Sequence, residues 1–331
     1  MLNYLLVILS NSSVPFCYYH GKSLKDKKNS LISLKNLKDA VIFAFKNNLK
    51  INFLFPDYKL NKKYEEVINE VEHIKIVPLK LHKTYRYSIL VTESSDFKNK
   101  EWLKSLKEEN IILRLQKKHL KKLSAFINAL IPKSKRINLV LLDIEKYTDK
   151  DISEYQQQLD KISENILKLK PGKHLPELNF LTDRITLEKM NNCDAGLSHL
   201  TLAPNGMLYL CPAFYYDNEK NNLGKIRNEI DIKNKQILEL KYSPICIICD
   251  AYQCKRCIYL NKKLTLELNT PSSQQCKLSH AEREVSRLLL NKLKDKKQYF
   301  NYNEIPVIDY SDPFVIAEKN KFSISDFKNL F

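Results

Sequence analysis

Cysteine thiols are the side chains of this sequence whose number and spacing could do chemistry. Seven of the eight cysteines lie in one quarter of the 331-residue chain: Cys193, Cys211, Cys246, Cys249, Cys254, Cys257 and Cys276. The middle four are spaced C-x2-C-x4-C-x2-C, and each C-x2-C pair can bring two thiolates to one metal without straining the backbone. One zinc site or one iron–sulfur cluster needs four ligands, so seven thiols are nearly enough for two sites. The pattern therefore predicts a metal-binding region.

A tight turn positions two of these thiols. We expect strands over residues 199–203 and 207–211, joined by Ala203-Pro204-Asn205-Gly206. Proline presets the backbone of a turn, while asparagine and glycine tolerate positive φ, so this is a hairpin signal. The hairpin would bring Cys211 back towards Cys193. The rest of the region predicts a short strand over residues 223–226 and helices over residues 232–240 and 280–293.

The first half of the chain alternates apolar runs with amphipathic segments. Strands are expected over residues 4–9, 51–55, 74–78, 87–92, 111–115 and 137–142, and a further one over residues 176–182. Helices are expected over residues 31–47, 64–71, 98–109, 118–130 and 151–169, the first capped by Ser30 or Ser33. Such alternation predicts an α/β fold with a parallel sheet and outer helices, either open and doubly wound or curled into a barrel.

Composition excludes several classes of protein. The net charge of +17 comes mostly from lysine, and we interpret it mainly as solvated surface charge. No glycine-rich phosphate loop occurs, and no apolar run is long enough for a membrane helix. We reject a signal peptide at residues 1–9 and expect a cytoplasmic protein without a membrane partner. Because disulfides are rare in that compartment, we interpret the clustered cysteines as metal ligands first.

The cysteine region resembles a SPASM domain, the auxiliary iron–sulfur domain of radical S-adenosylmethionine (radical SAM) peptide maturases. The likeness rests on the order of the seven cysteines, on Gly206 between the first two, and on the Leu210-Cys211-Pro212 and Leu223-Gly224-x-Ile226 segments. The middle block is one residue shorter than usual in each of its last two gaps. The resemblance implies two 4Fe-4S auxiliary clusters. One would be held by Cys246, Cys249, Cys254 and Cys276, and the other by Cys193, Cys211 and Cys257.

The fourth ligand of the second cluster is unassigned, because the residues around Leu187 offer no eighth cysteine. An open iron, an exogenous ligand or a carboxylate such as Asp194 could complete it. Zinc is the alternative metal, since C-x2-C pairs also build zinc sites. Zinc explains the middle block better than it explains the hairpin cysteines.

The cysteine motif of radical SAM enzymes, C-x3-C-x2-C, is incomplete here. In the loop after the first strand, Cys17 matches its last cysteine, but Ser10 and Val14 stand at the other two positions. The Gly-Gly-Glu that contacts the cofactor is also missing, since residues 51–57 read INFLFPD. We therefore interpret Cys17 as a single thiol without metal and expect no S-adenosylmethionine. The resemblance implies a partial (β/α)6 TIM-like barrel over residues 1–182, the SPASM-like domain over 183–290 and a tail over 291–331.

A chain of this length with a SPASM-like region but no radical motif is similar to the CXXX repeat peptide maturase group. The segment from Gln275 to Arg283 looks like that group too. The resemblance implies a non-radical role in post-translational maturation of a ribosomally made, cysteine-rich precursor peptide (a RiPP), beside a true radical SAM maturase. We expect no autonomous radical SAM enzyme.

Two other functions stay open. One is a zinc-stabilised basic nucleic-acid-binding protein using residues 117–122 and 133–136, although no recognition motif supports a nucleic-acid partner. The other is a radical enzyme with unusual cluster ligands.

Overall fold

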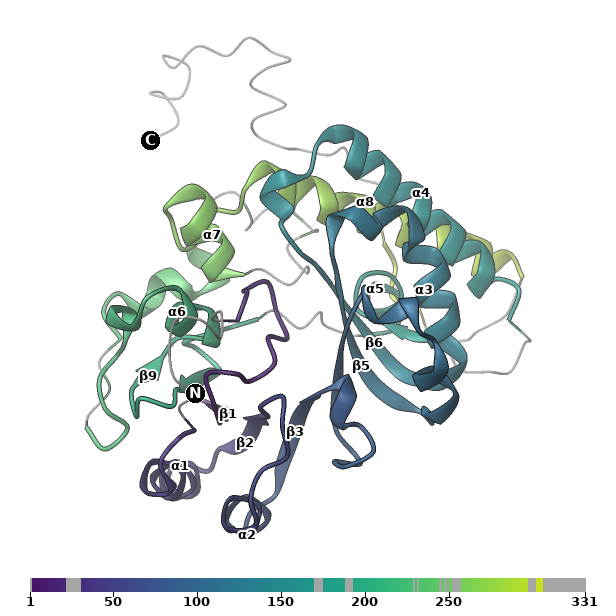
Figure 1. The fold of residues 1–331 in the computed structure, drawn as a ribbon. Helices are drawn as coiled ribbons and strands as arrows, with labels where there is room; N and C mark the ends of the chain where they lie inside the picture. The colour runs from purple at the N-terminus through teal and green to yellow at the C-terminus, as the bar shows by residue number, and fades with distance from the viewer. Residues whose placement is uncertain are drawn as a thin grey trace, which may run out of the picture.

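One sheet organises the part of the chain that the structure describes (Figure 1). The structure is a computed structural model, and it describes residues 2–21, 31–169, 175–187, 193–228, 230, 232–243, 246, 249, 251, 257–296 and 302–305. Within these ranges the sheet has nine strands in the order β7-β6-β5-β4-β3-β2-β1-β8-β9. The strands are β1 (Tyr4–Ile8), β2 (Lys50–Leu54), β3 (His73–Pro78), β4 (Ile89–Glu93), β5 (Glu109–Leu115), β6 (Ser134–Leu141), β7 (Glu177–Leu178), β8 (His199–Leu202) and β9 (Leu208–Tyr209).

Neighbouring strands are parallel except for β8 and β9, which pair antiparallel as a hairpin. The six expected strands of the first half, the short seventh and the hairpin are confirmed. Their apolar runs form strands because parallel strands in such a sheet are covered on both faces. In β1, for example, the four residues from Leu5 to Ile8 are all buried. The α/β class and its mostly parallel sheet are thus confirmed.

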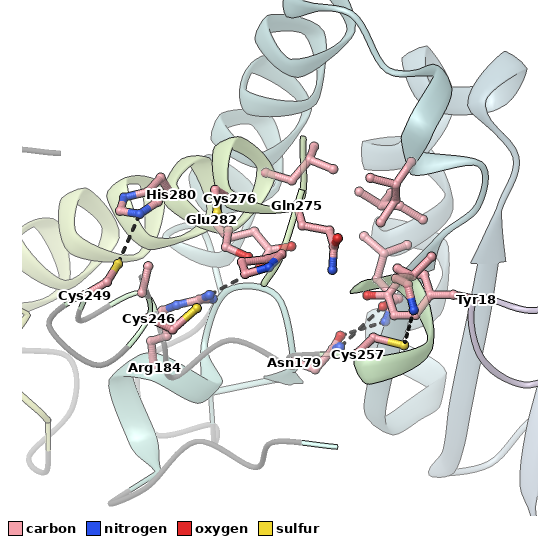
Figure 2. Close-up of a pocket in the computed structure, with 18 of the residues that line it drawn as sticks. Tyr18, Asn179, Arg184, Cys246, Cys249, Cys257, Gln275, Cys276, His280 and Glu282 are labelled. Carbon is pink, nitrogen blue, oxygen red and sulfur yellow. Dashed lines mark hydrogen bonds and ion pairs between the residues drawn. The ribbon is translucent and has the colours of Figure 1, made fainter. Parts of the chain in front are cut away.

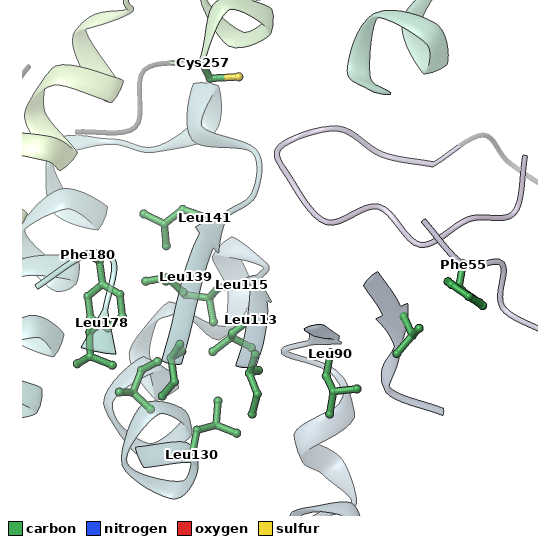
Figure 3. Packing of buried hydrophobic residues seen from close by; sticks show 14 of the residues in the cluster. Phe55, Leu90, Leu113, Leu115, Leu130, Leu139, Leu141, Leu178, Phe180 and Cys257 are labelled. Atoms are coloured by element: carbon green, nitrogen blue, oxygen red, sulfur yellow. The ribbon is translucent and has the colours of Figure 1, made fainter. Parts of the chain in front are cut away.

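Helices α1 to α4 and α8 cover the outer face of the curved sheet, with α4 and α8 side by side, whereas α6 packs on the inner face (Figure 1). The helices are α1 (Leu34–Lys46), α2 (Lys62–Asn69), α3 (Leu123–Leu130), α4 (Asp149–Ile166), α5 (Asp183–Thr186), α6 (Pro212–Asp217), α7 (Ile258–Thr265) and α8 (Ser273–Asp295). Alternate strand residues point to opposite faces. Leu113 and Leu115 of β5 pack under the helices (Figure 3), whereas Ile112 between them joins a second cluster on the inner face. Cys17, Cys193 and Cys211 pack with this inner-face cluster.

Two predicted helices are wrong, and local hydrogen bonding explains both. The segment 98–109 instead contains the end of one 3-10 turn (Asp96–Lys98), a second turn (Glu101–Ser105) and the start of β5. The Asn99 side chain accepts a hydrogen bond from the Glu101 N–H (3.0 Å), which competes with helix formation. In the segment 232–240, Asn234 has a φ of +52°, and a 3-10 turn (Lys235–Leu238) follows it. Positive φ at a residue with a Cβ is incompatible with a continuing helix.

Capping residues determine where helices α1 and α8 begin. Ser33 caps α1 as expected, accepting a hydrogen bond from the Asn36 N–H. Helix α8 begins at Ser273 rather than at residue 280, because Ser272 and Gln275 form a reciprocal capping box. Cys276 therefore lies inside the first turn of α8. Helix α7, which follows Cys257, was not predicted.

The sheet and α8 both run across the domain boundaries expected from the sequence. Strands β8 and β9 extend the same sheet as β1, and α8 ends at Asp295. The division at residues 182/183 and 290/291 therefore stays a prediction about folding units. Of the helices in the described ranges, none combines the length and the apolar character needed to cross a membrane.

Candidate metal centre

The loop that carries Cys17 is fixed to the ends of the first two strands. The Ser13 hydroxyl donates to the Leu54 carbonyl (2.8 Å), and the Val14 N–H donates to the Phe55 carbonyl (3.1 Å). The loop follows β1 directly, as the sequence predicts. Its path past β2 is therefore set by hydrogen bonds and not only by packing.

A buried arginine holds the far end of the same loop. Arg114, in β5, is 3% exposed and forms an ion pair with Glu93 of β4. Its guanidinium donates to the carbonyls of Tyr19 (2.7 Å) and Cys17 (3.3 Å). A buried guanidinium without such acceptors would be strongly destabilising, so the four groups position one another. Cys17 thus has its backbone tied to the centre of the sheet.

The β8–β9 hairpin lies between Cys193 and Cys211 in the chain. Gly206 in the turn has a φ of +79°, and a Cβ there would meet the Asn36 side chain at 2.6 Å, so glycine is required. Cys211 lies two residues after the end of β9 and is buried, while Cys193 precedes β8 and is half-buried. Both pack with the inner-face cluster, as does Cys17. The expected return of the chain at the hairpin is confirmed.

Cys257 joins these three thiols from a distant part of the chain. It is the N-cap of α7, is buried, and its sulfur accepts a hydrogen bond from the Leu260 N–H (3.5 Å). Figure 3 shows it beyond Leu141, past the end of β6. Its thiol is hydrogen-bonded to the Cys17 thiol and interacts electrostatically with those of Cys193 and Cys211. We name Cys17, Cys193, Cys211 and Cys257 the barrel-side thiol group.

Burial and mutual repulsion govern the ionisation of this group. The hydrogen bond that the Cys257 S–H donates to Cys17, burial and the neighbouring thiols all raise the pKa of Cys257 well above its usual range. Burial, then Cys193 and Cys17, raise the pKa of Cys211. Ionising several buried thiols together is unfavourable unless a cation lies among them. Soft metals bind thiolates and supply that positive charge, so this donor set fits an iron–sulfur cluster or zinc.

A second set of thiols lines a cavity beside α8. Cys246, Cys249 and Cys276, here named the helix-side thiol group, are half-buried and line a cavity of about 100 Å³ (Figure 2). His280 lies one turn after Cys276 on α8, and its Nε2 is 3.4 Å from the Cys249 sulfur. His280 is not among the ligands expected from the sequence. Its i,i+4 spacing from Cys276 was the available signal, because such residues share one face of a helix.

The two groups meet at Cys257, which belongs to the first and also lines the cavity of the second. Tyr18, the neighbour of Cys17, lines that cavity too (Figure 2). The structure therefore brings six of the seven expected ligands into two adjacent groups that share Cys257, and which of them would hold which metal stays a prediction. The seventh, Cys254, lies outside the described residues.

The thiols are neighbours but are not arranged around a single point. Within the described ranges, no three or more His, Cys, Asp or Glu side chains are placed so that they could hold a metal ion. Asp194, considered above as a fourth ligand, is exposed. Cys17, expected to be a single thiol, instead lies in the barrel-side group.

No protein-family model and no curated protein matches the sequence. Among solved structures, the chain is similar to native anSMEcpe with bound AdoMet and Kp18Cys peptide, with a TM-score of 0.56 and 13% identity over 89% of this chain and 99% of that one. Streptococcus suis SuiB bound to S-adenosylmethionine matches with a TM-score of 0.49 and 13% identity over 82% of this chain and 77% of that one. At 13% identity, the likeness to anSMEcpe shows a shared fold and confirms the expected relation at that level alone.

Proposed function

We propose that this chain, which shares its fold with a radical SAM/SPASM peptide maturase, is a SPASM-type metal protein without radical chemistry of its own. It would act in the maturation of a ribosomally made peptide with CXXX repeats, as the peptide-binding or electron-transfer partner of a true radical SAM enzyme. The observation that carries the proposal is the gathering of six cysteines from the second half of the chain into two adjacent groups on this fold.

The loop after β1 supports the absence of radical chemistry. Ser10 is fully buried, its N–H is bonded to the Ser13 hydroxyl (3.0 Å), and its own hydroxyl lies 3.2 Å from that of Ser12. Val14 packs with the inner-face cluster and has no atom that binds iron. Only Cys17 in this loop has the thiolate that a cluster needs. Three thiolates from one loop, which a radical cluster requires, are not available.

The filling of the inner face gives independent support. The rings of Tyr19 and Tyr216 stack there with centroids 5.1 Å apart, and both side chains are buried. The Tyr215 hydroxyl donates to the Asn11 side chain from the same side. Three tyrosines and the apolar residues around them occupy space on the side of the sheet where the loop after β1 lies. This packing favours a scaffold over a pocket for S-adenosylmethionine.

Two 4Fe-4S clusters are the cofactors that this donor set fits best. Cys246, Cys249, Cys254 and Cys276 would hold one beside α8, and Cys193, Cys211 and Cys257 would hold the other on the inner face. Such clusters transfer single electrons. The half-buried thiols at the cavity would give the helix-side cluster access to a peptide, whereas two of the three barrel-side ligands, Cys211 and Cys257, are buried.

The peptide role is tested with anaerobically purified, full-length protein. A synthetic precursor segment with CXXX repeats should bind with micromolar affinity or better, and the same peptide with every cysteine replaced by serine should bind at least tenfold more weakly. The reduced protein alone should not cleave S-adenosylmethionine. Cleavage by the isolated chain would contradict the non-radical role, and equal binding of the two peptides would contradict recognition of cysteine.

A further inference from the structure

One thiol in the barrel-side group has no role in the proposed function. Cys17 lies in the loop after β1, far in sequence from the other seven cysteines, yet its thiol is hydrogen-bonded to that of Cys257. Cys193 and Cys211 pack with the same inner-face cluster. The site that the other three cysteines would form lacks exactly one protein ligand. Cys17 therefore lies beside the three-cysteine site that lacks a fourth ligand.

We propose that Cys17 is the fourth protein ligand of the barrel-side metal site, which Cys193, Cys211 and Cys257 complete. The site would then be a closed four-thiolate 4Fe-4S cluster that joins the loop after β1 to the hairpin and to α7. This inference rests on the proposed iron–sulfur role of the cysteine region and adds a ligand to it. It replaces the open iron, the exogenous ligand and Asp194 as ways to complete the site.

The anchoring of the Cys17 loop shows that its position is built into the fold. The Cys17 carbonyl accepts a hydrogen bond from Arg114, which is buried and ion-paired with Glu93. The Tyr19 carbonyl accepts a second hydrogen bond from the same guanidinium. A loop held at two carbonyls by one buried charge has little freedom to turn the thiol away from its neighbours. Asp194 lacks comparable placement, because its side chain is exposed at a residue with a φ of +44°.

The chemistry of the group suits a cluster of four irons. Around one zinc ion, sulfurs about 2.3 Å from the metal stand roughly 3.8 Å apart, so all four must converge on one point. A 4Fe-4S cluster takes one thiolate on each of four irons, so its ligands surround a larger body and stand farther apart. The four thiols interact with one another without converging on one point, which matches the second arrangement.

The test compares Cys17→Ser and Cys17→Ala with Val14→Ala, a control that perturbs the same loop without removing a thiol. Each full-length protein is purified anaerobically, and its iron, sulfide and reduced electron paramagnetic resonance (EPR) spectrum are measured with and without added small thiol. The wild type and Val14→Ala should contain about eight irons per chain, as expected for two 4Fe-4S clusters, and their spectra should not respond to the thiol.

The Cys17 variants have two supporting outcomes. Either they lose about half of the iron, or they keep it and acquire a spectrum that shifts with added thiol because one iron is now open. Iron content and spectra identical to the wild type would overturn the inference while leaving the proposed function intact. A wild-type protein without iron and sulfide would overturn both.

Hydrogen exchange distinguishes ligation by Cys17 from a role of its side chain in packing alone. Reconstitution of the metal-free wild type with iron and sulfide should slow exchange of the amides in residues 10–21 by at least tenfold. The same treatment should leave exchange in Cys17→Ser unchanged, since its loop is no longer tied to the cluster. Equal slowing in both proteins would contradict ligation by Cys17.

Discussion

The two thiol groups differ in how the fold holds them. The barrel-side group lies on segments tied to regular elements: a loop fixed by Arg114, the two ends of a hairpin, and the N-cap of α7. Cys211 and Cys257 are 8% and 6% exposed, while Cys17 and Cys193 are half-buried. The helix-side group is half-buried at a cavity, and only Cys276 among its three members lies on a regular element. The barrel-side arrangement favours a structural role for its metal, and the helix-side arrangement favours access of a substrate to its metal.

This difference assigns two roles, stabilising the fold and contacting the peptide, to separate metal sites. Buried thiolates without a metal repel one another in a medium that solvates charge poorly, so the barrel-side group should make folding depend on its metal. Thiols at a cavity remain partly hydrated without metal and can meet a substrate. The comparison therefore predicts a cluster that holds the fold beside a cluster that meets the peptide.

The largest expected effect is on stability when one thiol of each group is replaced. Cys211→Ser should lower the free energy of unfolding by more than about 4 kcal/mol, because loss of a metal site belongs to the most damaging changes known. Cys249→Ser should lower it by about 2 kcal/mol, because its site is half exposed. Urea titration of the anaerobic proteins measures both values. Equal losses would mean that the two groups do not differ in their structural role.

Removal of the buried arginines gives the next largest effect. Arg114→Met leaves Glu93 unpaired at the inner face and frees the Cys17 loop, so the unfolding free energy should fall by about 3 kcal/mol. Arg184→Met is the matched variant, since Arg184 is also buried and pairs with Glu282 at the cavity (3.3 Å).

Spectra distinguish these two arginine variants even if their stabilities agree. Arg114→Met should alter the EPR signal of the barrel-side cluster alone, and Arg184→Met should alter that of the helix-side cluster alone. If both variants changed the same signal, the separation into two groups would be wrong.

Acid should weaken the protein through His199 of β8. Burial lowers the pKa of His199 to about 4 from the ordinary 6.5, and its ring stacks on Tyr4 (4.6 Å). The native state keeps this histidine neutral, so protons bind the unfolded chain preferentially as the pH falls from about 6.5 towards 4. Stability is therefore complete above about pH 6.5 and should fall by about 2 kcal/mol between pH 7 and pH 5 through this residue.

His199→Gln isolates that contribution. The variant has no titrating group at this position, so its unfolding free energy should vary about 2 kcal/mol less than that of the wild type between pH 7 and pH 5. Other groups, including the thiols, titrate in both proteins and cancel in the difference. Parallel pH profiles would show that His199 does not stay neutral in the folded chain.

The smallest effect is expected from His280, whose Nε2 lies 3.4 Å from the Cys249 sulfur. A hydrogen bond to a ligand sulfur stabilises the reduced cluster, and one of about 1 kcal/mol corresponds to about 40 mV for a one-electron couple. His280→Ala should therefore lower one midpoint potential by about 40 mV and leave the other unchanged. Redox titration followed by EPR measures both. A shift of both potentials would mean that His280 acts through the fold.

The sequence predicts the sheet better than it predicts the site. Continuous apolar runs such as the one from Tyr4 to Leu9 can hardly be anything but buried strands, and the Pro204-Asn205-Gly206 turn determines the hairpin locally. The helix expected over residues 98–109 fails because one side chain, Asn99, captures the backbone donor that a helix would use. Local patterns therefore succeed where no local hydrogen bond competes.

Cys17 and His280 show what a sequence pattern leaves out. Spacing groups the cysteines from Cys193 onwards, but nothing near Cys17 signals that its thiol lies beside Cys257. That contact depends on Arg114, on the register of the parallel strands and on the start of α7, all of which are tertiary. His280 could have been recognised from its spacing to Cys276, had the capping box of Ser272 and Gln275 been used to start α8 earlier.

Metal analysis of the anaerobically purified full-length chain tests the central claim most directly. The account predicts about eight irons and about eight sulfides per chain, with no stoichiometric zinc, as two 4Fe-4S clusters require. One or two zinc ions per chain without iron or sulfide would contradict it and would make the cysteine region a zinc-stabilised structure.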